Sequence, residues 1–351
     1  MGNLHHIPTR YRVYFLVLLY IYFLPIQKEK LDLSLIMKYI IRKLQSEDLS
    51  AAVNLFIKSY ESERESSPLL PPEQDRFKLI SDSLKCIINN PSVAIFEDST
   101  LVSFMITKGY FKFKGQKAAM IPEYGHSSIA KDKKKLYQLM YMKMAEYWIR
   151  ENVHLHLIGH FANDITVKEI LFQLGFGAIL AERLRDLSPV KVRKPIEINS
   201  IDDPADLLEI QIEHNAFYTS SPIFITKSLD LQIIKRDLEE QFSSGLKTLA
   251  YRENGEIAAY MIVGESGIDE EGFLLQHSNS AALHSAFIKP HLRGTGIGTA
   301  LLNGAISLAG EKGYERMMVE HETANYFGGN FWSKYFDPYI YFSMRYIDNS
   351  I

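Results

Sequence analysis

Residues 284–300 constrain the fold of this chain more than any other stretch. They read His284-Ser-Ala-Phe-Ile-Lys-Pro-His-Leu-Arg-Gly-Thr-Gly-Ile-Gly-Thr-Ala300, which predicts an apolar strand, a glycine-spaced loop and a helix that begins near Gly298. Glycine allows consecutive backbone N–H groups to turn toward one point without Cβ clashes. The N-terminus of the following helix adds about half a positive charge at that point. The stretch therefore predicts an anion site for a phosphate or pyrophosphate group.

The glycine spacing excludes two common nucleotide-binding loops. A P-loop requires Gly-Lys-Ser/Thr after four spacer residues, and that pattern is absent. A dinucleotide loop requires G-x-G-x-x-G, whereas these glycines are spaced G-x-G-x-G. The pattern Arg-x-x-Gly-x-Gly of Arg293, Gly296 and Gly298, set between a strand and a helix, resembles the acetyl-CoA pyrophosphate loop of GNAT-family N-acetyltransferases.

The expected secondary structure occurs twice along the chain. Hydrophobic periodicity and turn residues predict a first series of strands at 39–44, 92–96, 101–107, 118–121, 153–158 and 179–185, with helices at 46–60, 74–89, 133–150 and 166–174. A second series has strands at 196–199, 248–252, 257–263, 286–288, 316–321 and 339–347, with helices at 204–217, 227–243, 298–312 and 326–335. The two series match at a nearly constant offset, which indicates an internal duplication of one domain.

The order of the elements in each series is that of the GNAT fold, so residues 37–351 resemble a tandem GNAT protein. The resemblance implies an α/β (α+β) chain of two GNAT-like domains, each a mixed, mostly antiparallel, twisted sheet flanked by helices. We expect a degenerate domain at 37–188, a linker at 189–195 and a catalytic domain at 196–351. In the first domain, the loop Ser127–Lys135 aligns with the glycine loop but has no glycine, so we expect this copy to shape the acceptor cleft or the interdomain contact.

The resemblance also implies which residues contact acetyl-CoA. The backbone of Phe287 and Ile288 is expected to pair with the pantetheine arm as an added strand would. An N–H near Ala286 or Phe287 is expected to polarise the thioester carbonyl. Arg293 would support the loop, and Asn325 would contact the arm. The expected cofactor-binding residues are Phe287, Ile288, Arg293, Gly294, Thr295, Gly296, Ile297, Gly298, Thr299, Asn325 and Trp332.

The family's general acid is a tyrosine, and Trp332 stands at the matching position. Indole N–H is only a hydrogen-bond donor and does not release its proton near neutral pH. Tyr335 or Tyr326 would then substitute, or no acid is needed because a thiol with a pKa near ~8.5 is a tolerable leaving group. We expect Trp332 to be a packing residue and select Tyr335 as the candidate acid.

An amine acceptor must lose a proton before it attacks the acetyl group, so a general base is expected. Candidates are His284 at the start of the glycine-loop strand, and Glu320, His321 and Glu322 at the end of the next strand. Side chains alternate along a strand, which puts the two glutamates on one face and His321 on the other. We select Glu322 first, because it lies nearest Asn325 in the sequence, with His284 as a further candidate.

Composition limits the partners and the compartment. A net charge of −3 argues against a general nucleic-acid or anionic-membrane binder. The single cysteine, Cys86, cannot form an internal disulfide, which fits a cytoplasmic protein, and we expect it to be buried. His154, His156 and His160 have no acidic or cysteine ligand nearby, so we expect no metal.

Residues 1–36 differ in composition from the rest of the chain. Residues 13–26 are almost wholly apolar, but this stretch is shorter than the ~20 residues that span a bilayer, and no cleavage site follows. Three interpretations remain open: Met37 as the true start, a membrane-touching or targeting segment, or a partner-binding helix.

The resemblance thus implies an acetyl-CoA-dependent N-acetyltransferase in which an amine attacks the thioester directly in a ternary complex. The acceptor would be a small-molecule or peptide amine. One alternative is a non-catalytic acyl-CoA-binding or regulatory GNAT-fold protein, which the tryptophan at position 332 favours. Another is a GNAT-fold aminoacyl or other acyl transferase. Neither the acceptor nor the oligomeric state follows from the sequence.

Overall fold

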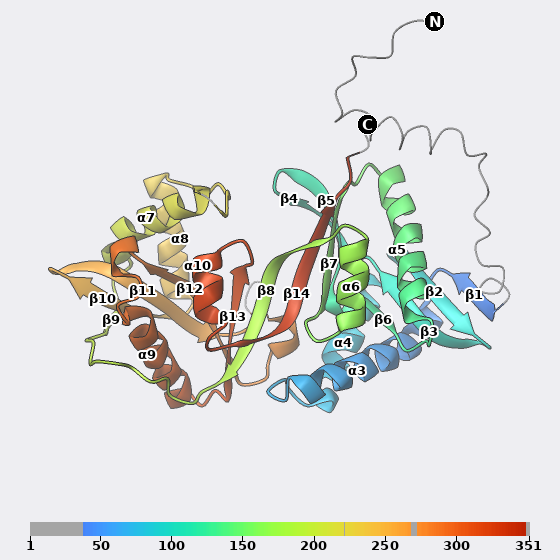
Figure 1. Cartoon of the computed structure of the whole chain (residues 1–351), viewed down its shortest axis with the longest axis horizontal. Helices are drawn as coiled ribbons and strands as arrows, with labels where there is room; N and C mark the ends of the chain where they lie inside the picture. The colour runs from blue at the N-terminus through green and yellow to red at the C-terminus, as the bar shows by residue number, and fades with distance from the viewer. Residues whose placement is uncertain (1–37, 221, 268–271, 349–351) are drawn as a thin grey trace, which may run out of the picture.

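The computed structural model describes residues 38–220, 222–267 and 272–348, and it contains two halves that lie side by side (Figure 1). Residues 1–36 lie outside the described ranges, so the interpretations of that segment stay predictions. The N-terminal half contains, in order, β1 (Tyr39–Arg42), α3 (Leu49–Ser66), α4 (Glu73–Ile87), β2 (Ser92–Glu97), β3 (Thr100–Ile106), β4 (Gly109–Phe113), β5 (Gln116–Ile121), β6 (His126–Ser128), α5 (Lys133–Arg150), β7 (Leu155–Phe161), α6 (Ile165–Gln173) and β8 (Gly177–Asp186).

The C-terminal half repeats this order, with the single strand β12 in the place of β5 and β6 and without a counterpart of β4. It contains β9 (Asn199–Ile201), α7 (Leu208–Thr219), α8 (Leu231–Ser243), β10 (Lys247–Glu253), β11 (Glu256–Glu265), β12 (Ser280–Ile288), α9 (Ile297–Glu311), β13 (Arg316–Glu322), α10 (Tyr326–Trp332) and β14 (Asp337–Tyr346). The predicted duplication is therefore confirmed in the order of helices and strands. The extra hairpin strand β4 and the first residues of β12 were not predicted.

Two local expectations were wrong. The helix predicted at 46–60 does not begin at Ser46, which opens a 3-10 turn, and α3 begins at Leu49; the Asp48 side chain accepts a hydrogen bond from the Gln45 amide at 2.8 Å. Cys86 is exposed rather than buried, because it falls on the outer face of α4, whose inner face presents Ile80 and Leu84 to the core.

The last strands of the two halves are exchanged. Within the described residues, the larger sheet has the strand order β4-β5-β7-β14-β8-β13-β12-β11-β10-β9. Strand β8 of the N-terminal half pairs with β13 of the C-terminal half, with Leu180 opposite Glu322. Strand β14 pairs with β7, with Ser343 opposite Ile158, and the two exchanged strands also pair with each other. This exchange makes one continuous ten-stranded sheet across both halves, and Figure 1 shows β8 and β14 at its centre.

Apolar side chains cover both faces of the sheet in the C-terminal half. Tyr260 and Phe287 pack with α7 and α8 on one face. Met261 and Val319 pack with α9 on the other face, in a core that includes Leu301. This alternation of successive strand residues between two helix layers is the pattern expected of a buried strand.

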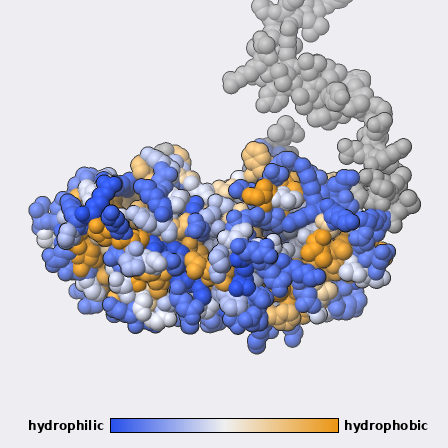
Figure 2. Space-filling model, turned by 60° about the horizontal axis from the view of Figure 1, so that its bottom comes forward, coloured by the Kyte–Doolittle hydropathy of each residue, from blue (hydrophilic) through white to orange (hydrophobic). Residues whose placement is uncertain are grey.

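Figure 2 shows one face as mainly hydrophilic, with apolar side chains gathered in separate patches. No helix within the described ranges combines the length and the apolar character that crossing a bilayer requires.

Candidate active site

The candidate site lies where β12 and β13 separate. The two strands pair in parallel from Ser280 opposite Arg316 to Leu283 opposite Val319, and the pairing ends there. His284 is the extra residue of a bulge, because Leu283 lies opposite Val263 while Ser285 lies opposite Ile262. Beyond this bulge the strands diverge and a cavity of about 520 Å³ opens between them. The edge of β12 beyond Leu283 is therefore free of β13.

The free edge of β12 presents backbone groups to this cavity. The Lys289 amide donates to the carbonyl of Ala258 on β11 at 3.0 Å, and Phe287 lies opposite Tyr260 on the same strand. Backbone groups of successive residues point to opposite edges of a strand. Hence Phe287 directs its N–H and C=O toward β11, so the expectation that its backbone pairs with the pantetheine arm was wrong. Ala286 and Ile288 direct theirs toward the cavity.

The glycine loop ends at the N-terminus of α9, beside the same cavity. The first backbone hydrogen bond of α9 runs from the Ala300 amide to the Gly296 carbonyl at 3.0 Å. The amides of residues 297–299 therefore have no acceptor within the helix. Gly294 has φ of 79° and Gly296 has φ of 100°, both in the left-handed region that favours glycine. A Cβ on Gly298 would lie 3.0 Å from Ile288 Cδ1 and 3.2 Å from Phe331 Cε2. The loop is thus shaped by glycine at each of the three positions.

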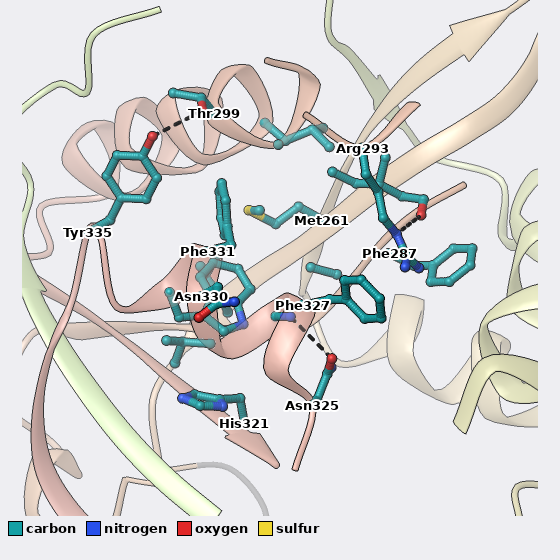
Figure 3. A pocket seen from close by; sticks show the side chains of 18 of the residues that line it. Met261, Phe287, Arg293, Thr299, His321, Asn325, Phe327, Asn330, Phe331 and Tyr335 are labelled. Atoms are coloured by element: carbon teal, nitrogen blue, oxygen red, sulfur yellow. Dashed lines mark hydrogen bonds between the residues drawn. The ribbon is translucent and has the colours of Figure 1, made fainter. Parts of the chain in front are cut away.

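Arg293 joins the loop to the end of β12. Its Nε donates to the Ile288 carbonyl at 3.3 Å, as Figure 3 shows. Its guanidinium lies 4.9 Å from the ring centre of Phe217 and 5.0 Å from that of Phe327. Partial burial lowers the pKa of Arg293 without removing its charge. The residue therefore ties strand, loop, α7 and α10 together and places a cation at the cavity wall.

The structure brings nearly all of the predicted site residues to this one cavity. Those that line it are His284, Phe287, Ile288, Arg293, Gly294, Thr295, Gly296, Gly298, Thr299, Glu322, Asn325, Trp332 and Tyr335. Ile297 is the exception, because its side chain is buried in the core beneath α9 and leaves only its backbone amide for the site.

The predicted residues on and after α10 have distinct surroundings. Asn325 caps the helix, its Oδ1 accepting from the Gly328 amide at 3.1 Å. Trp332 is only 7% exposed and packs against Phe336 in the core, as expected of a packing residue. The Tyr335 hydroxyl lies 3.2 Å from the Thr299 hydroxyl at the start of α9 (Figure 3).

The candidate bases differ in their hydrogen bonds. Burial raises the pKa of the Glu322 carboxyl, while the charges of Lys114 and Lys227 oppose this shift. His321 Nδ1 bonds to the Glu322 carbonyl at 3.0 Å and its Nε2 accepts from Arg183 Nε at 2.9 Å, so both nitrogens are engaged. His284 Nε2 bonds to the Glu265 carbonyl at 3.1 Å.

Sequence reasoning missed two groups of residues that line the cavity. Lys191 and Arg193 come from the segment between the halves and bring two cations to the cavity. His214 on α7 and Tyr260 on β11 lie on the opposite side of β12 from α9. The cationic composition of the linker could have pointed to Lys191 and Arg193. His214 and Tyr260 could not be found in this way, because they come together through a contact between elements far apart in the sequence.

The corresponding place in the N-terminal half has a smaller cavity of about 420 Å³, which Ser128, Lys133 and Asp164 line, but it has no glycine loop. There the strand is interrupted: β5 pairs with β7 and β6 pairs with β3, with a 3-10 turn between them. The buried His126 ring bridges this position, with Nε2 bonded to the Gly159 carbonyl at 2.7 Å and Nδ1 to the Tyr137 hydroxyl at 2.8 Å. Lys133, at the start of α5, forms an ion pair with Asp164 at the start of α6.

Comparisons with known proteins agree with this geometry. Residues 213–336 match the model of the acetyltransferase (GNAT) family. A GCN5-related N-acetyltransferase from Sphaerobacter thermophilus is similar over 89% of this chain and 97% of its own, with 12% identity and a TM-score of 0.58. The GCN5-related glucosamine N-acetyltransferase region of a fungal multi-domain GH3 beta-N-acetylglucosaminidase is similar over 87% of this chain and 38% of that chain, with 14% identity and a TM-score of 0.52. A comparison with curated proteins gave no match.

The fold is that of GNAT proteins, and the family of the matching domain generally transfers acyl groups. The chain carries an acetyltransferase (GNAT) family domain over residues 213–336, and the fold of two GNAT-like halves is confirmed.

Proposed function

We propose that this chain is an acetyl-CoA-dependent N-acetyltransferase whose active site lies in the C-terminal half. The observation that carries the proposal is that one cavity contains both the free edge of β12 and the glycine loop at the start of α9. An extended arm could pair with the first, and an anionic group could bind the second. A CoA thioester has both groups, an extended pantetheine arm and an anionic pyrophosphate.

The residues of the loop fit a pyrophosphate group. Nothing lies within 4 Å of a Cβ built on Gly294, so this side of the loop is open to a ligand. The amides of residues 297–299 would donate to the phosphate oxygens, and the dipole of α9 would favour their charge. Arg293, Lys191 and Arg193 would add cations around the same group. Acetyl-CoA would supply the acetyl thioester.

The remaining groups of the cavity would act on the reacting atoms. The Ala286 N–H, on the free edge of β12, would donate a hydrogen bond to the thioester carbonyl oxygen. Glu322 would accept the proton of the attacking amine, since its raised pKa improves it as a base. Tyr335 would donate a proton to the departing thiolate. No covalent enzyme nucleophile is required for this direct attack.

We further propose that residues 37–188 form a degenerate GNAT-like domain that binds no acetyl-CoA. The loop before α5 has no glycine, and the Lys133 ammonium that lines the corresponding cavity is already paired with Asp164. Through β8, this half instead supplies the strand that borders β13. We place the protein in the cytoplasm, where its exposed single thiol would stay reduced.

The test uses the full chain with acetyl-CoA and a panel of small-molecule and peptide amines, and it follows the release of free thiol. Amine-dependent thiol release is the expected result. Binding of acetyl-CoA without turnover on any amine would favour the non-catalytic acyl-CoA-binding alternative. Turnover with another acyl-CoA or an aminoacyl donor, but not with acetyl-CoA, would favour a different acyl transferase. Failure to bind any acyl-CoA would overturn all of these assignments.

A further inference from the structure

A chain of hydrogen bonds leads from the loop after α7 to the cavity. Asn215 Nδ2 donates to the Ser228 carbonyl at 2.8 Å, and Gln211 Nε2 donates to Asn215 Oδ1 at 2.9 Å. Gln211 Oε1 lies 2.7 Å from the hydroxyl of Tyr260, which in turn lies 2.7 Å from Nδ1 of His214. The chain begins at a backbone carbonyl, which can only accept a hydrogen bond.

This starting point fixes the direction of every bond in the chain. Because Asn215 must present its NH₂ group to the carbonyl, its oxygen faces Gln211, and the same reasoning turns Gln211 Oε1 toward Tyr260. Tyr260 has one hydroxyl proton, and it must donate this proton to Gln211. Its oxygen then accepts from His214, so Nδ1 of His214 carries a hydrogen and Nε2 of the uncharged ring carries a lone pair.

The Nε2 atom of His214 is open to the cavity. It has no hydrogen-bond partner among the described residues. It is not fully buried, so it retains contact with solvent. Only 6% of the residue is exposed, and the residue lines the cavity. One face of the ring stacks on Phe287, with ring centres 4.8 Å apart. The accessible edge therefore faces the space beside the free edge of β12.

The charges around His214 favour the uncharged ring. Burial, with the charges of Lys227 and Arg293, lowers the pKa of His214 to about 3. The charge of Lys227 also acts on Glu322, which shares the α7 side of the sheet with His214. Lys227 thus influences both residues from the same side of the cavity. A second cation beside His214 is disfavoured, whereas an uncharged N–H or O–H group can bond to Nε2.

Resting on the proposed function, we propose that the hydrogen-bond chain holds His214 in the Nδ1–H form so that Nε2 accepts a hydrogen bond from an uncharged N–H or O–H group of the acceptor. His214 would then contact the acceptor directly, on the α7 side of the cavity. Tyr260, Gln211 and Asn215 would be positioning residues that act through it. His321 cannot take this role, since both of its ring nitrogens already have partners.

The tautomer can be measured without any substrate. In full-length protein labelled with ¹⁵N-histidine, the resonances assigned through a His214→Asn variant should report the Nδ1–H form. Tyr260→Phe removes the acceptor for that hydrogen and should release the ring toward the Nε2–H form. Ser285→Ala is the matched control, because it removes the other hydroxyl near Tyr260, at 3.1 Å, and leaves the chain intact. A predominant Nε2–H form in the unmodified protein would overturn the proposal.

Kinetics with an amine found to be a substrate test the contact itself. His214→Asn keeps a donor for Tyr260 but has no acceptor at the ε position, so it should raise the KM for the acceptor about three- to tenfold. His214→Gln returns an amide to that position and should recover part of the loss. The Kd for acetyl-CoA should stay within about twofold in both variants. Unchanged acceptor KM in both would overturn the contact.

Failure of the proposed function has a different signature. If the unmodified protein acetylates no amine, the proposed function falls, and the contact with an acceptor falls with it. If the protein is active but His214 is in the Nε2–H form, the inference alone is wrong.

Discussion

The Nε2 atom of His321 accepts a hydrogen bond from Arg183 Nε at 2.9 Å. Arg183 belongs to β8, which reaches the C-terminal half only through the exchange of the last strands. The N-terminal half thereby supplies a partner to a histidine of the candidate site. With Nδ1 bonded to the Glu322 carbonyl, this histidine is held in place and has no free lone pair.

His321→Gln should therefore lower kcat by less than about threefold, because the substituted amide can still accept from Arg183. Burial, which lowers the pKa of His321, also keeps the ring uncharged near neutral pH. Steady-state kinetics with a substrate amine measure the effect. A loss of about 100-fold would identify His321 as the base and contradict this assignment.

Glu322→Gln should lower kcat/KM by about 100-fold or more, because it removes the proposed general base. Its carboxyl must be ionised to accept a proton, and burial raises its pKa above the usual 4.5. Hence kcat/KM should fall as the pH is lowered through that raised pKa, and this limb should vanish in the variant. Glu320→Gln, two residues away on the same face, is the control. A loss below about threefold would remove Glu322 from the mechanism.

Tyr335→Phe should lower kcat by about 100-fold if this residue protonates the leaving thiolate. Among the residues that the structure describes, its hydroxyl pairs only with that of Thr299, so Thr299→Val shows how much of the effect comes from losing this contact. Tyr326→Phe tests the other tyrosine considered, whose side chain is more exposed. Rapid-quench or steady-state measurements would settle the ranking. If kcat in all three variants equals that of the unmodified protein, the thiolate leaves without an acid.

Glu63 should make the N-terminal half less stable as the pH rises. It is buried in α3 beside Asn163, and burial raises its pKa to about 7. A carboxyl whose folded-state pKa is raised favours folding below its unfolded pKa and loses this contribution as the pH passes the folded value. The unfolding free energy of the unmodified protein should fall relative to Glu63→Gln by on the order of 2–3 kcal/mol between about pH 4.5 and 8.

Urea unfolding at several pH values measures this difference. Glu65→Gln is the matched control, since this side chain is exposed on the same helix. Parallel pH profiles for Glu63→Gln and the unmodified protein would contradict the raised pKa.

The sequence predicted the elements that local patterns determine. Helix α5 has the predicted bounds, because Leu136, Met140, Met144 and Trp148 recur at helical spacing and are all buried. The glycine loop was predicted for a similar reason, since its backbone conformation depends on its own residues. The first half of β12 was missed because small and polar residues such as Ser280 and Ala281 are weak strand signals.

The strand exchange could not be predicted in this way. Strands β8 and β14 have the same length and place in their halves, and each could pair with either β7 or β13. The choice depends on the packing of both halves at once, including Tyr339 of β14, which donates a hydrogen bond to Glu182 of β8 in the core. The hydrogen-bond chain that ends at His214 was missed for the same reason, because it joins α7, β11 and a loop.

The most direct test of the central claim is calorimetric titration of the full chain with acetyl-CoA, compared with Gly294→Ala and Gly313→Ala. The two glycines have nearly equal φ, 79° and 80°, and open space around a built Cβ, but Gly313 lies beyond the far end of α9. We predict one acetyl-CoA per chain, a Kd at least about tenfold higher in Gly294→Ala, and an unchanged Kd in Gly313→Ala. Two sites per chain, no binding, or equal effects of the two substitutions would contradict a single acetyl-CoA site at the glycine loop.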